Sequence, residues 1–351
     1  MALFAIKQIC YFLPFDQLFA WDENVDSDAL NTFLTIYRSG GVSNAAKILH
    51  RSQPAISRRI ALLERELGVP LFERIAGRTV LSDAGRVMVP YAVRAVAAAQ
   101  DAEKAVRALV RSHSGPVALA VVGTLAGGGL AAIMKSFARE HPEVDLTLRT
   151  ATSAEVSGLI RRGEATIGLR YEMDRSDDLD CELLFTEPLQ VVCAPDHPRA
   201  SSRVAKLADL RGERWIAFPE VPGRREITAS HVFALFQTLN MGEVDWTPVD
   251  SLTAQKRLIE SGLGIALLAR SHVADELRSS AIATIAVGDL VADQDIVAVT
   301  RRGGFLSAAS RRLLDIIRAH YTADGITEAG EGGPRTKKSR ARNGTRPRRK
   351  K

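Results

Sequence analysis

Cysteine is scarce in this chain of 351 residues, and long apolar runs are missing. The three cysteines, Cys10, Cys181 and Cys193, form no Cys-x-x-Cys pair and no even disulfide framework, which is typical of proteins in a reducing cytoplasm. A redox sensor at Cys181 or Cys193 is one interpretation, and an incidental buried thiol is the simpler one. No segment reaches the ~18 apolar residues of a membrane span, so we expect a cytoplasmic protein without a membrane partner.

Motifs of common enzyme classes are also missing. The sequence has no His-Glu-x-x-His, no Gly-x-Ser-x-Gly and no cysteine–histidine spacing typical of metal sites. Thr124 and the glycines after it loosely resemble a phosphate-binding loop, but no Gly-Lys-Ser/Thr follows. The seven histidines form no constellation. We therefore expect no catalysis, no metal and no cofactor, and a binding protein is the leading class.

Positive charge is concentrated at the C-terminal end. The net charge is +6, but residues 335–351 hold ten Lys or Arg and no acid, which leaves −4 for the rest. Residues 323–351 are predicted to be a disordered basic tail, which either attracts phosphates without sequence preference or only aids solubility. Residues 1–27 are predicted to be an extension outside the folded pattern, and we expect Val25, read from a GTG codon, to be the natural start.

Three helical patterns follow one another from residue 28. The first, 29–39, carries an apolar stripe that includes Leu30 and Tyr37, and the second opens at Ser43. The third starts after Ser52, an expected N-cap, with Pro54 in its first turn. Its apolar residues recur at helical spacing and are expected to be buried: Ile56, Ile60, Leu63 and Leu67.

The third helix keeps polar residues at its N-terminal end, away from that stripe. Gln53, Ser57 and Arg58 lie there, since Arg58 is about 200° around the helix from Ile56 at 3.6 residues per turn. Glutamine suits adenine edges, arginine suits guanine, and serine suits phosphate, as in a recognition helix in the major groove. Extended runs at 71–74 and 78–81 predict a hairpin wing whose Arg74 and Arg78 contact the DNA backbone. A solvated helical bundle is the alternative.

The same segment resembles the LysR-type transcriptional regulators. The resemblance lies in AAKILHRSQPAISRRI at 45–60, LLE at 62–64 and ELGVPLFER at 66–74. It implies a winged helix-turn-helix over 28–82 that binds double-stranded promoter DNA, with RNA polymerase as a further partner. Recognition-helix contacts carried over by resemblance are Ser52, Gln53, Pro54, Ser57 and Arg58; Ser43 and Arg51 complete our expected DNA-binding set. Ser82 stands where the family usually has Thr and keeps the capping hydroxyl.

A long helical pattern over 83–114 predicts a linker helix. Its apolar positions repeat at intervals of three and four, as in a helix that pairs with another helix: Met88, Tyr91, Ala95, Ala98, Ala102, Ala105 and Leu109. An alanine-rich helix packed on its own domain is the alternative. The resemblance favours a homodimer or homotetramer, because members of the family pair through this linker.

Strands alternate with helices over 115–322, which predicts parallel sheet covered by helices. Two such units follow one another, with chain crossings expected near Glu187 and Val287. We predict lobe 1 at 115–186 and 288–322, and lobe 2 at 187–287. The expected fold is therefore α/β: an N-terminal winged helix-turn-helix, a long linker helix and a C-terminal two-lobed periplasmic-binding-protein-like domain, as the family resemblance also implies.

Four residues are expected to face the cleft between the lobes and bind a small-molecule effector. Ligands of open α/β sheets bind beyond the carboxyl ends of strands, near helix N-termini. Thr124 and Phe218 end strands, while Ser153 and Thr253 lie where helices begin, although ordinary capping explains those two equally well. Free N–H groups and hydroxyls favour an anionic or hydroxylated effector. An enzyme and an exported solute-binding protein are the competing classes.

Overall fold

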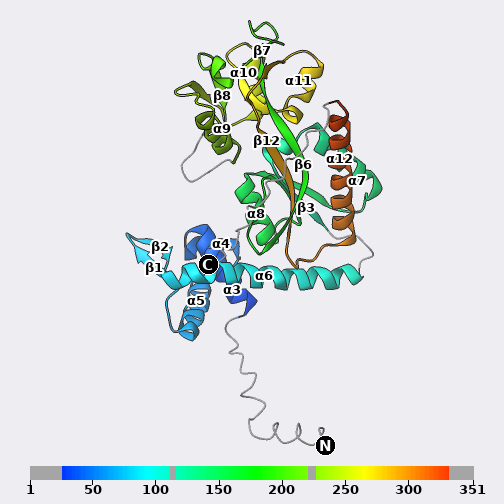
Figure 1. The fold of residues 1–351 in the computed structure, drawn as a ribbon. Coiled ribbons are helices and arrows are strands. Elements are labelled where there is room, and N and C mark those ends of the chain that lie inside the picture. The colour runs from blue at the N-terminus through cyan, green and yellow to red at the C-terminus, as the bar shows by residue number, and fades with distance from the viewer. Residues whose placement is uncertain (1–25, 111–115, 220–226, 332–351) are drawn as a thin grey trace, which may run out of the picture.

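The N-terminal unit is a three-helix core with a two-stranded wing. The computed structural model describes residues 26–110, 116–219 and 227–331. The elements of this unit, visible at the lower left of Figure 1, are α3 (Ser27–Ser39), α4 (Val42–Ile48), α5 (Gln53–Leu67), β1 (Phe72–Ile75) and β2 (Arg78–Leu81). The helix-turn-helix and its wing thus form where the sequence predicts them.

Apolar residues of all three helices meet in one core. Phe33, Ile56 and Leu63 are at most 1% exposed, and the Phe33 ring lies 5.3 Å from that of Phe72 at the base of the wing. Two residues of the predicted stripes do not join this core: Tyr37 is 48% exposed and Leu67 is 38% exposed. Both lie in the last turns of their helices, so periodicity alone overestimates the buried face there.

Ser82 joins the wing to the linker helix. Its hydroxyl donates to the carbonyl of Pro70 (2.6 Å) and accepts from the N–H of Gly85 (3.0 Å), so the expected capping role is confirmed. A Cβ on Gly85 would lie 2.1 Å from the carbonyl oxygen of Leu71, a distance that no side chain tolerates. The glycine therefore lets the helix start close against the DNA-binding unit.

The linker helix α6 (Asp83–Val110) crosses the molecule beneath the C-terminal domain (Figure 1). Ala92 is buried in the core of the DNA-binding unit and Ala97 is buried near Gly163 of lobe 1, while Met88 packs on the core of the DNA-binding unit rather than on a seam. Tyr91 is 61% exposed, and the predicted seam residues Ala95, Ala98 and Ala102 are exposed too. Leu109 lies outside the described side chains. Pairing of this face with another helix stays a prediction.

The first lobe is a sheet between helices. Its elements are β3 (Val117–Val122), α7 (Gly128–Glu140), β4 (Leu146–Ala151), α8 (Ser153–Arg161), β5 (Ile167–Tyr171), parts of β6 (Leu179–Cys193) and β12 (Asp293–Arg301), and α12 (Ala308–Glu331). Strands β4, β3 and β5 are parallel as predicted, whereas β12 runs antiparallel to β5 and to β6. The predicted parallel sheet is therefore a mixed sheet.

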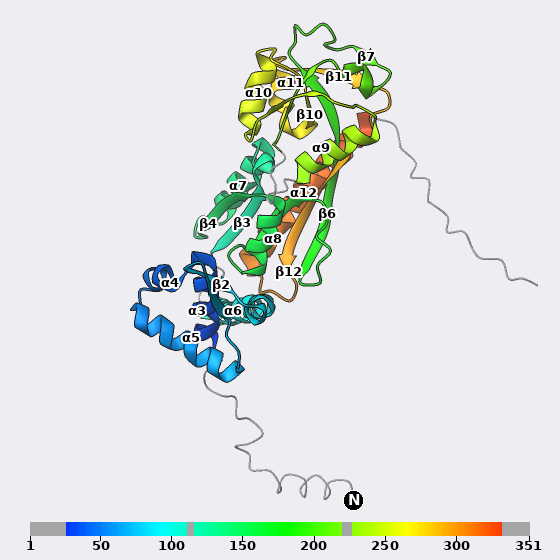
Figure 2. The same ribbon diagram turned by 90° about the vertical axis from the view of Figure 1, so that its left-hand side faces the viewer.

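Two long strands, β6 and β12, pass from one lobe to the other, as Figures 1 and 2 show. Phe185 on β6 packs on the core of lobe 1, and Leu189 on the same strand belongs to the core of lobe 2. Glu187 lies between them and pairs with Gln294 of β12, both 2% exposed. The second crossing thus falls a few residues after Val287, which ends a strand of lobe 2. The exact lobe limits stay predictions.

The second lobe has its own core around Trp215, which is 1% exposed and packs edge-on against Phe236. Its elements are β7 (Arg203–Val204), β8 (Arg214–Ala217), α9 (Ile227–Thr238), β9 (Asp245–Pro248), α10 (Leu252–Glu260), β10 (Ala266–Ala269), the 3-10 turn η3 (Arg270–His272), α11 (Ala274–Arg278) and β11 (Ala283–Val287). Strands β10 and β11 pair with the far end of β6, so the lobe is built on the crossing strand.

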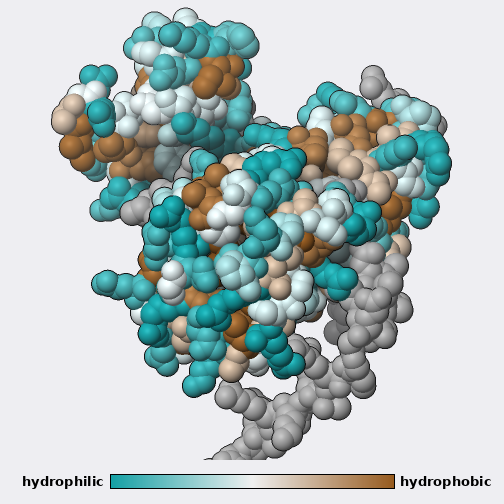
Figure 3. All heavy atoms as spheres, turned by 90° about the horizontal axis from the view of Figure 1, so that it is seen from above, coloured by the Kyte–Doolittle hydropathy of each residue, from teal (hydrophilic) through white to brown (hydrophobic). Residues whose placement is uncertain are grey.

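The two ends of the chain are described only in part. Helix α12 continues to Glu331, so residues 323–331 are helical and not part of a disordered tail as predicted. The remaining basic tail, residues 332–351, and the predicted extension with Val25 lie outside the described residues. None of the helices in the described ranges combines the length and apolar character needed to cross a membrane. On the face shown in Figure 3, hydrophobic patches (brown) lie among hydrophilic ones (teal).

Candidate DNA-binding surface and effector cleft

The N-terminal end of α5 presents a row of exposed polar residues. Ser52 is the N-cap, and its hydroxyl accepts from the N–H of Ala55 at 3.4 Å, as predicted. Gln53, Ser57 and Arg58 are exposed, while Ile56 between them is buried. Pro54, in the first turn, is exposed as well. The helix therefore holds its expected contact residues outward because its opposite face is fixed in the core.

Two arginines of this region are held by acids at the start of α3. Arg51 Nη1 lies 3.0 Å from Asp28 Oδ2, and Arg59 contacts both Asp28 (3.1 Å) and Asp26 (3.1 Å). Asp26 also caps α3, accepting from the N–H of Ala29 at 2.6 Å. The pKa of Asp26 is lowered: burial raises it, but hydrogen bonds from Ala29 and Arg59 outweigh burial. This network orients α3 and α5 relative to each other.

The wing adds two further arginines. Arg74 on β1 and Arg78 on β2 are exposed, and β1 pairs with β2 through Arg74 opposite Thr79. Within residues 26–110 and the other described ranges, no carboxylate lies within ion-pair distance of Arg58, Arg74 or Arg78. Ser43 is exposed, but α4 starts one residue earlier, at Val42, with Gly41 as its N-cap and no side-chain cap. All nine expected DNA-binding residues are thus exposed, and their contact with DNA stays a prediction.

A cavity of about 570 Å³ lies between the two lobes. Lobe 1 contributes the ends of β3 and β4 and the start of α8, and lobe 2 contributes the start of α10 and the segment from η3 to α11. Thr124, Phe218 and Thr253, three of the four expected effector residues, line it. The structure thus brings these three together across the cleft.

Ser153, the fourth, does not line the cleft. It is 1% exposed, and its hydroxyl accepts from the backbone N–H of Tyr171 at 3.3 Å. The N-cap of α8 is Thr152, which forms a capping box with Glu155 and does line the cleft. Thr253 is likewise not a cap, because Ser251 caps α10 and Thr253 lies in its first turn. The sequence therefore placed both caps wrongly, by one residue at α8 and by two at α10.

A chain of hydrogen bonds connects the lobes at the cleft. The Tyr171 hydroxyl lies 2.6 Å from Thr124 Oγ1 and 2.8 Å from His272 Nε2. His272 is fully buried by its packing, and burial, with a smaller contribution from Lys256, lowers its pKa to about 4. The ring is therefore neutral at pH 7. Sequence reasoning missed both Tyr171 and His272, because neither belongs to a local pattern.

Charged groups of both signs line the cleft. Lys256 Nζ lies 2.6 Å from Glu276 Oε1, so this cation is already paired; Asp250 and Asp275 are exposed, and Asp275 also pairs with Arg278. The pKa of Glu276 is lowered, because the hydrogen bond from Lys256 outweighs the effect of burial. The lining therefore combines two helix N-termini, which favour negative groups, with carboxylates, which favour positive ones.

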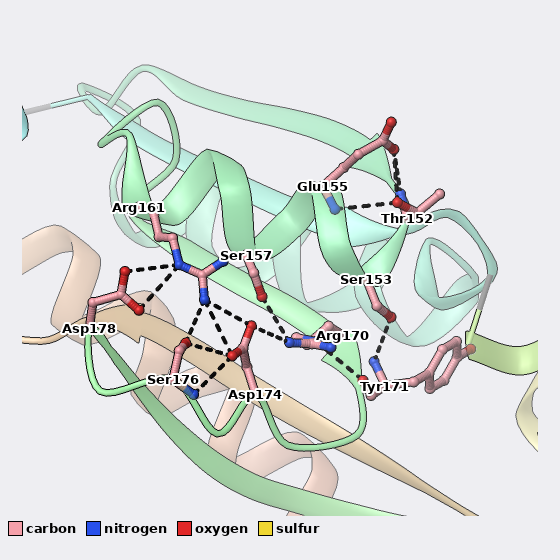
Figure 4. A network of polar contacts seen from close by, with 10 residues as sticks. All are labelled: Thr152, Ser153, Glu155, Ser157, Arg161, Arg170, Tyr171, Asp174, Ser176 and Asp178. Atoms are coloured by element: carbon pink, nitrogen blue, oxygen red, sulfur yellow. Dashed lines mark hydrogen bonds and ion pairs between the residues drawn. The ribbon is translucent and has the colours of Figure 1, made fainter. Parts of the chain in front are cut away.

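Arg170 is engaged inside lobe 1 and does not reach the surface. It is 5% exposed and donates to Ser157 Oγ and to Asp174 Oδ2, both at 2.8 Å (Figure 4). Burial raises the pKa of Asp174, but hydrogen bonds from Ser176 and Ser157 and the Arg161 charge lower it far more. Arg170 is therefore not available for effector binding.

Cys181 and Cys193 cannot pair with each other. Both lie on β6, near its two ends, about 40 Å apart at ~3.3 Å per residue, whereas disulfide Cα atoms lie within ~7 Å. Burial raises the pKa of both thiols, that of Cys193 to about 11, which disfavours the reactive thiolate. In the part of the chain that the structure describes, no group of three His, Cys, Asp or Glu could hold a metal ion.

Comparison with known proteins identifies both units. Residues 27–86 match the family model "Bacterial regulatory helix-turn-helix protein, lysR family", and residues 111–322 match "LysR substrate binding domain". The RuBisCO operon transcriptional regulator of Allochromatium vinosum is 27% identical over 281 residues, which cover 80% of this chain and 91% of that one. The regulator CitR of Bacillus subtilis is 28% identical over 253 residues, covering 72% and 85%.

Solved structures share the fold over most of the chain. A full-length OxyR point variant from Pseudomonas aeruginosa aligns with a TM-score of 0.61 and 19% identity, covering 85% of this chain and 94% of that one. Full-length LysG from Corynebacterium glutamicum, with bound effector Arg, aligns with a TM-score of 0.58 and 20% identity, covering 85% and 99%. With both domain models matched in order, the chain belongs to the LysR family of transcriptional regulators, proteins that bind DNA and respond to a small-molecule effector.

Proposed function

We propose that this regulator reads promoter DNA with the N-terminal end of α5, where Gln53, Ser57 and Arg58 enter the major groove. Ser43, Arg51, Ser52 and Pro54 lie alongside, and Arg74 and Arg78 of the wing contact phosphates. The observation that carries the proposal is the burial of Ile56 beside the exposed Ser57 and Arg58, which fixes the direction of these side chains. We further propose a cytoplasmic homodimer or homotetramer, paired through the exposed face of α6, that contacts RNA polymerase.

The effector is proposed to bind between Thr124, Phe218 and Thr253. The N-termini of α8 and α10 line this cleft and would receive a carboxylate or hydroxyl, while Asp250 and Asp275 would receive a positive group of the same molecule. The relative LysG was solved with Arg, a molecule with both kinds of group. The effector would shift the equilibrium between two lobe arrangements only to the extent that it binds one arrangement more tightly than the other. We propose binding without catalysis.

A DNase footprint on the DNA upstream of the gene tests the DNA-binding proposal. Wild-type protein should protect a dyad-symmetric site, and Arg58→Ala should weaken binding by about 10- to 100-fold, the cost of one good base contact. Arg65→Ala is the matched control, because Arg65 is exposed on α5 two turns further on and should change the affinity little. Equal loss in both variants, or protection by Arg58→Ala at wild-type concentrations, contradicts the assigned role of Arg58.

A further inference from the structure

A second cavity, of about 860 Å³, lies where the DNA-binding unit, the linker helix and lobe 1 meet. It is separate from the cleft between the lobes, since the two cavities share no lining residue. Helix α3 provides one wall, the N-terminal half of α6 a second, and α8 with the turn after it a third. Its lining residues are Leu34, Tyr37, Arg38, Val89, Pro90, Val93, Arg94, Gly158, Arg161, Arg162, Glu164 and Asp178.

Positive charge exceeds negative charge in this lining, which has four arginines and two carboxylates. Arg161 is neutralised within lobe 1, because it contacts Asp178 at 2.9 Å and Asp174 at 3.2 Å (Figure 4). Glu164 and three arginines remain. The net charge of the cavity therefore depends on how far the single carboxylate of Glu164 neutralises Arg38, Arg94 and Arg162.

Glu164 is shared among several guanidinium groups. Arg162 lies 2.5 Å from it, Arg149 from outside the cavity lies 3.2 Å away, and Arg38 lies 3.8 Å away, at the limit of an ion pair. Arg94 has no carboxylate within ion-pair distance in the described ranges; its guanidinium lies 4.7 Å from the centre of the exposed Tyr91 ring. The cavity thus holds cations whose charge is not balanced by the protein.

Crowding of like charges is visible at Arg38. Its pKa is lowered first by burial and next by the positive charge of Arg162, and Glu164 opposes this only in part. Arginines that come together from a DNA-binding helix and an effector domain repel each other unless an anion lies between them. Glu164 is close to both Arg38 and Arg162 but carries a single charge, so a further anion between them would reduce the repulsion.

The rest of the lining is apolar and includes one exposed ring. Leu34 is buried at the base, Val89 and Val93 are half-buried, and Tyr37 is 48% exposed although its position predicts burial. We propose that this cavity binds a small phosphorylated molecule, with its phosphate between Arg38, Arg94 and Arg162 and its apolar or aromatic body against Tyr37. Guanidinium groups bind phosphate through paired N–H donors, and aromatic rings stack on flat ligands.

Such a ligand contacts all three parts of the chain at once. Arg38 belongs to the DNA-binding unit, Arg94 to the linker and Arg162 to the turn that follows α8 in lobe 1. Binding therefore stabilises the arrangement in which these three parts meet. The size of the effect depends on how much higher the ligand affinity of that arrangement is than the affinity of other arrangements. The site gives the regulator a second chemical input, independent of the effector that the cleft takes.

Calorimetric titration of the full-length protein with AMP tests the proposal, with adenosine as the phosphate-free probe. AMP should bind and adenosine should not. Arg162→Gln and Arg94→Gln should each weaken AMP binding about tenfold or more, whereas Glu164→Gln should tighten it severalfold by removing the competing carboxylate. Arg94 is exposed, so its substitution should leave folding intact if Arg162→Gln does not. Higher salt should weaken binding.

Three control variants separate this site from other anion sites. Arg149→Gln removes a second partner of the same Glu164 but does not touch the cavity, so AMP affinity should stay within about twofold to threefold. Lys256→Gln in the cleft and Arg58→Ala on α5 should leave AMP binding unchanged. Loss of binding in either of those two, or unchanged binding in both Arg94→Gln and Arg162→Gln, overturns the proposal. The footprint of wild-type protein reports DNA binding separately, so either proposal can fail alone.

Discussion

The recognition helix and the effector cleft are built in opposite ways. Gln53, Ser57 and Arg58 lie within two turns of α5, and one buried face of that helix directs all of them outward. The cleft instead takes Thr124, Phe218 and His272 from segments far apart in the chain, on two lobes with separate cores. A surface on one helix is specified locally, whereas a cleft between lobes exists only once both lobes and their crossing strands are in place.

The recognition helix and the cleft also differ in the interactions that stabilise them. The DNA-binding unit depends on a small core, in which Phe33 and Leu63 are completely buried. The cleft depends on polar contacts between lobes, such as the hydrogen bond between Tyr171 and His272. Damage to a small core should unfold the unit that carries the site, whereas damage at the cleft should alter the balance between lobe arrangements or their response to pH.

Leu63→Ala should have the largest effect. Removing a fully buried leucine side chain costs about 2–5 kcal/mol, a large part of the stability of so small a unit. Calorimetric unfolding should show the DNA-binding unit melting earlier, with the effector domain unchanged. Leu67→Ala on the same helix is the control: at 38% exposure it should cost about 1 kcal/mol or less. A uniform shift of both domains would mean that the two regions do not unfold separately.

His272 should make the stability of the effector domain depend on pH. Its pKa is lowered to about 4 in the folded protein, whereas it is near 6.5 when the chain is unfolded. As the pH falls from about 6.5 towards 4, the unfolded chain takes up a proton that the buried ring does not, so stability is complete above 6.5 and is lost below it. The loss reaches about 3 kcal/mol for a shift of this size.

Urea unfolding at several values between pH 4.5 and 7.5 measures this dependence. His272→Gln should lack the part of the slope between pH 6.5 and 4, although it is also less stable at neutral pH. If His272→Gln keeps the wild-type slope, the pH dependence comes from other groups.

Much of the fold follows from local pattern in the sequence. The stripe of Ile56, Ile60 and Leu63 predicts both the length of α5 and the exposed position of Arg58, because a helix has one period and one buried face. The continuous apolar run VALAVV at 117–122 likewise coincides with β3. The cap at Ser82 is local on one side, since Gly85 donates to its hydroxyl three residues on, whereas its bond to Pro70 spans 12 positions.

Other features depend on partners far along the chain and leave no local signal. Tyr171 and His272 contact each other across 101 positions, and each alone is an ordinary core residue. Strand β6 starts at Leu179, but only its second half has a short apolar run, at 191–193; its first half mixes exposed and half-buried residues without regular alternation. The same limit explains the cavity lined by Arg38, Arg94 and Arg162: three helices must pack before these charges meet.

Thr152→Ala should have the smallest effect, and it tests whether Thr152, rather than the neighbouring Ser153 that the sequence suggests, is the N-cap of α8. Two capping residues, Thr152 and Ser153, stand side by side, and Glu155 decides between them because a capping box needs Glu three positions after the cap. Thr152→Ala should lower the free energy of unfolding of lobe 1 by about 1 kcal/mol, and Thr152→Ser should restore most of it. If Thr152→Ala keeps full stability in urea unfolding, Thr152 is not the N-cap of α8. The capping role would then belong to Ser153, and the Ser153 hydroxyl would face the cleft as the sequence predicts.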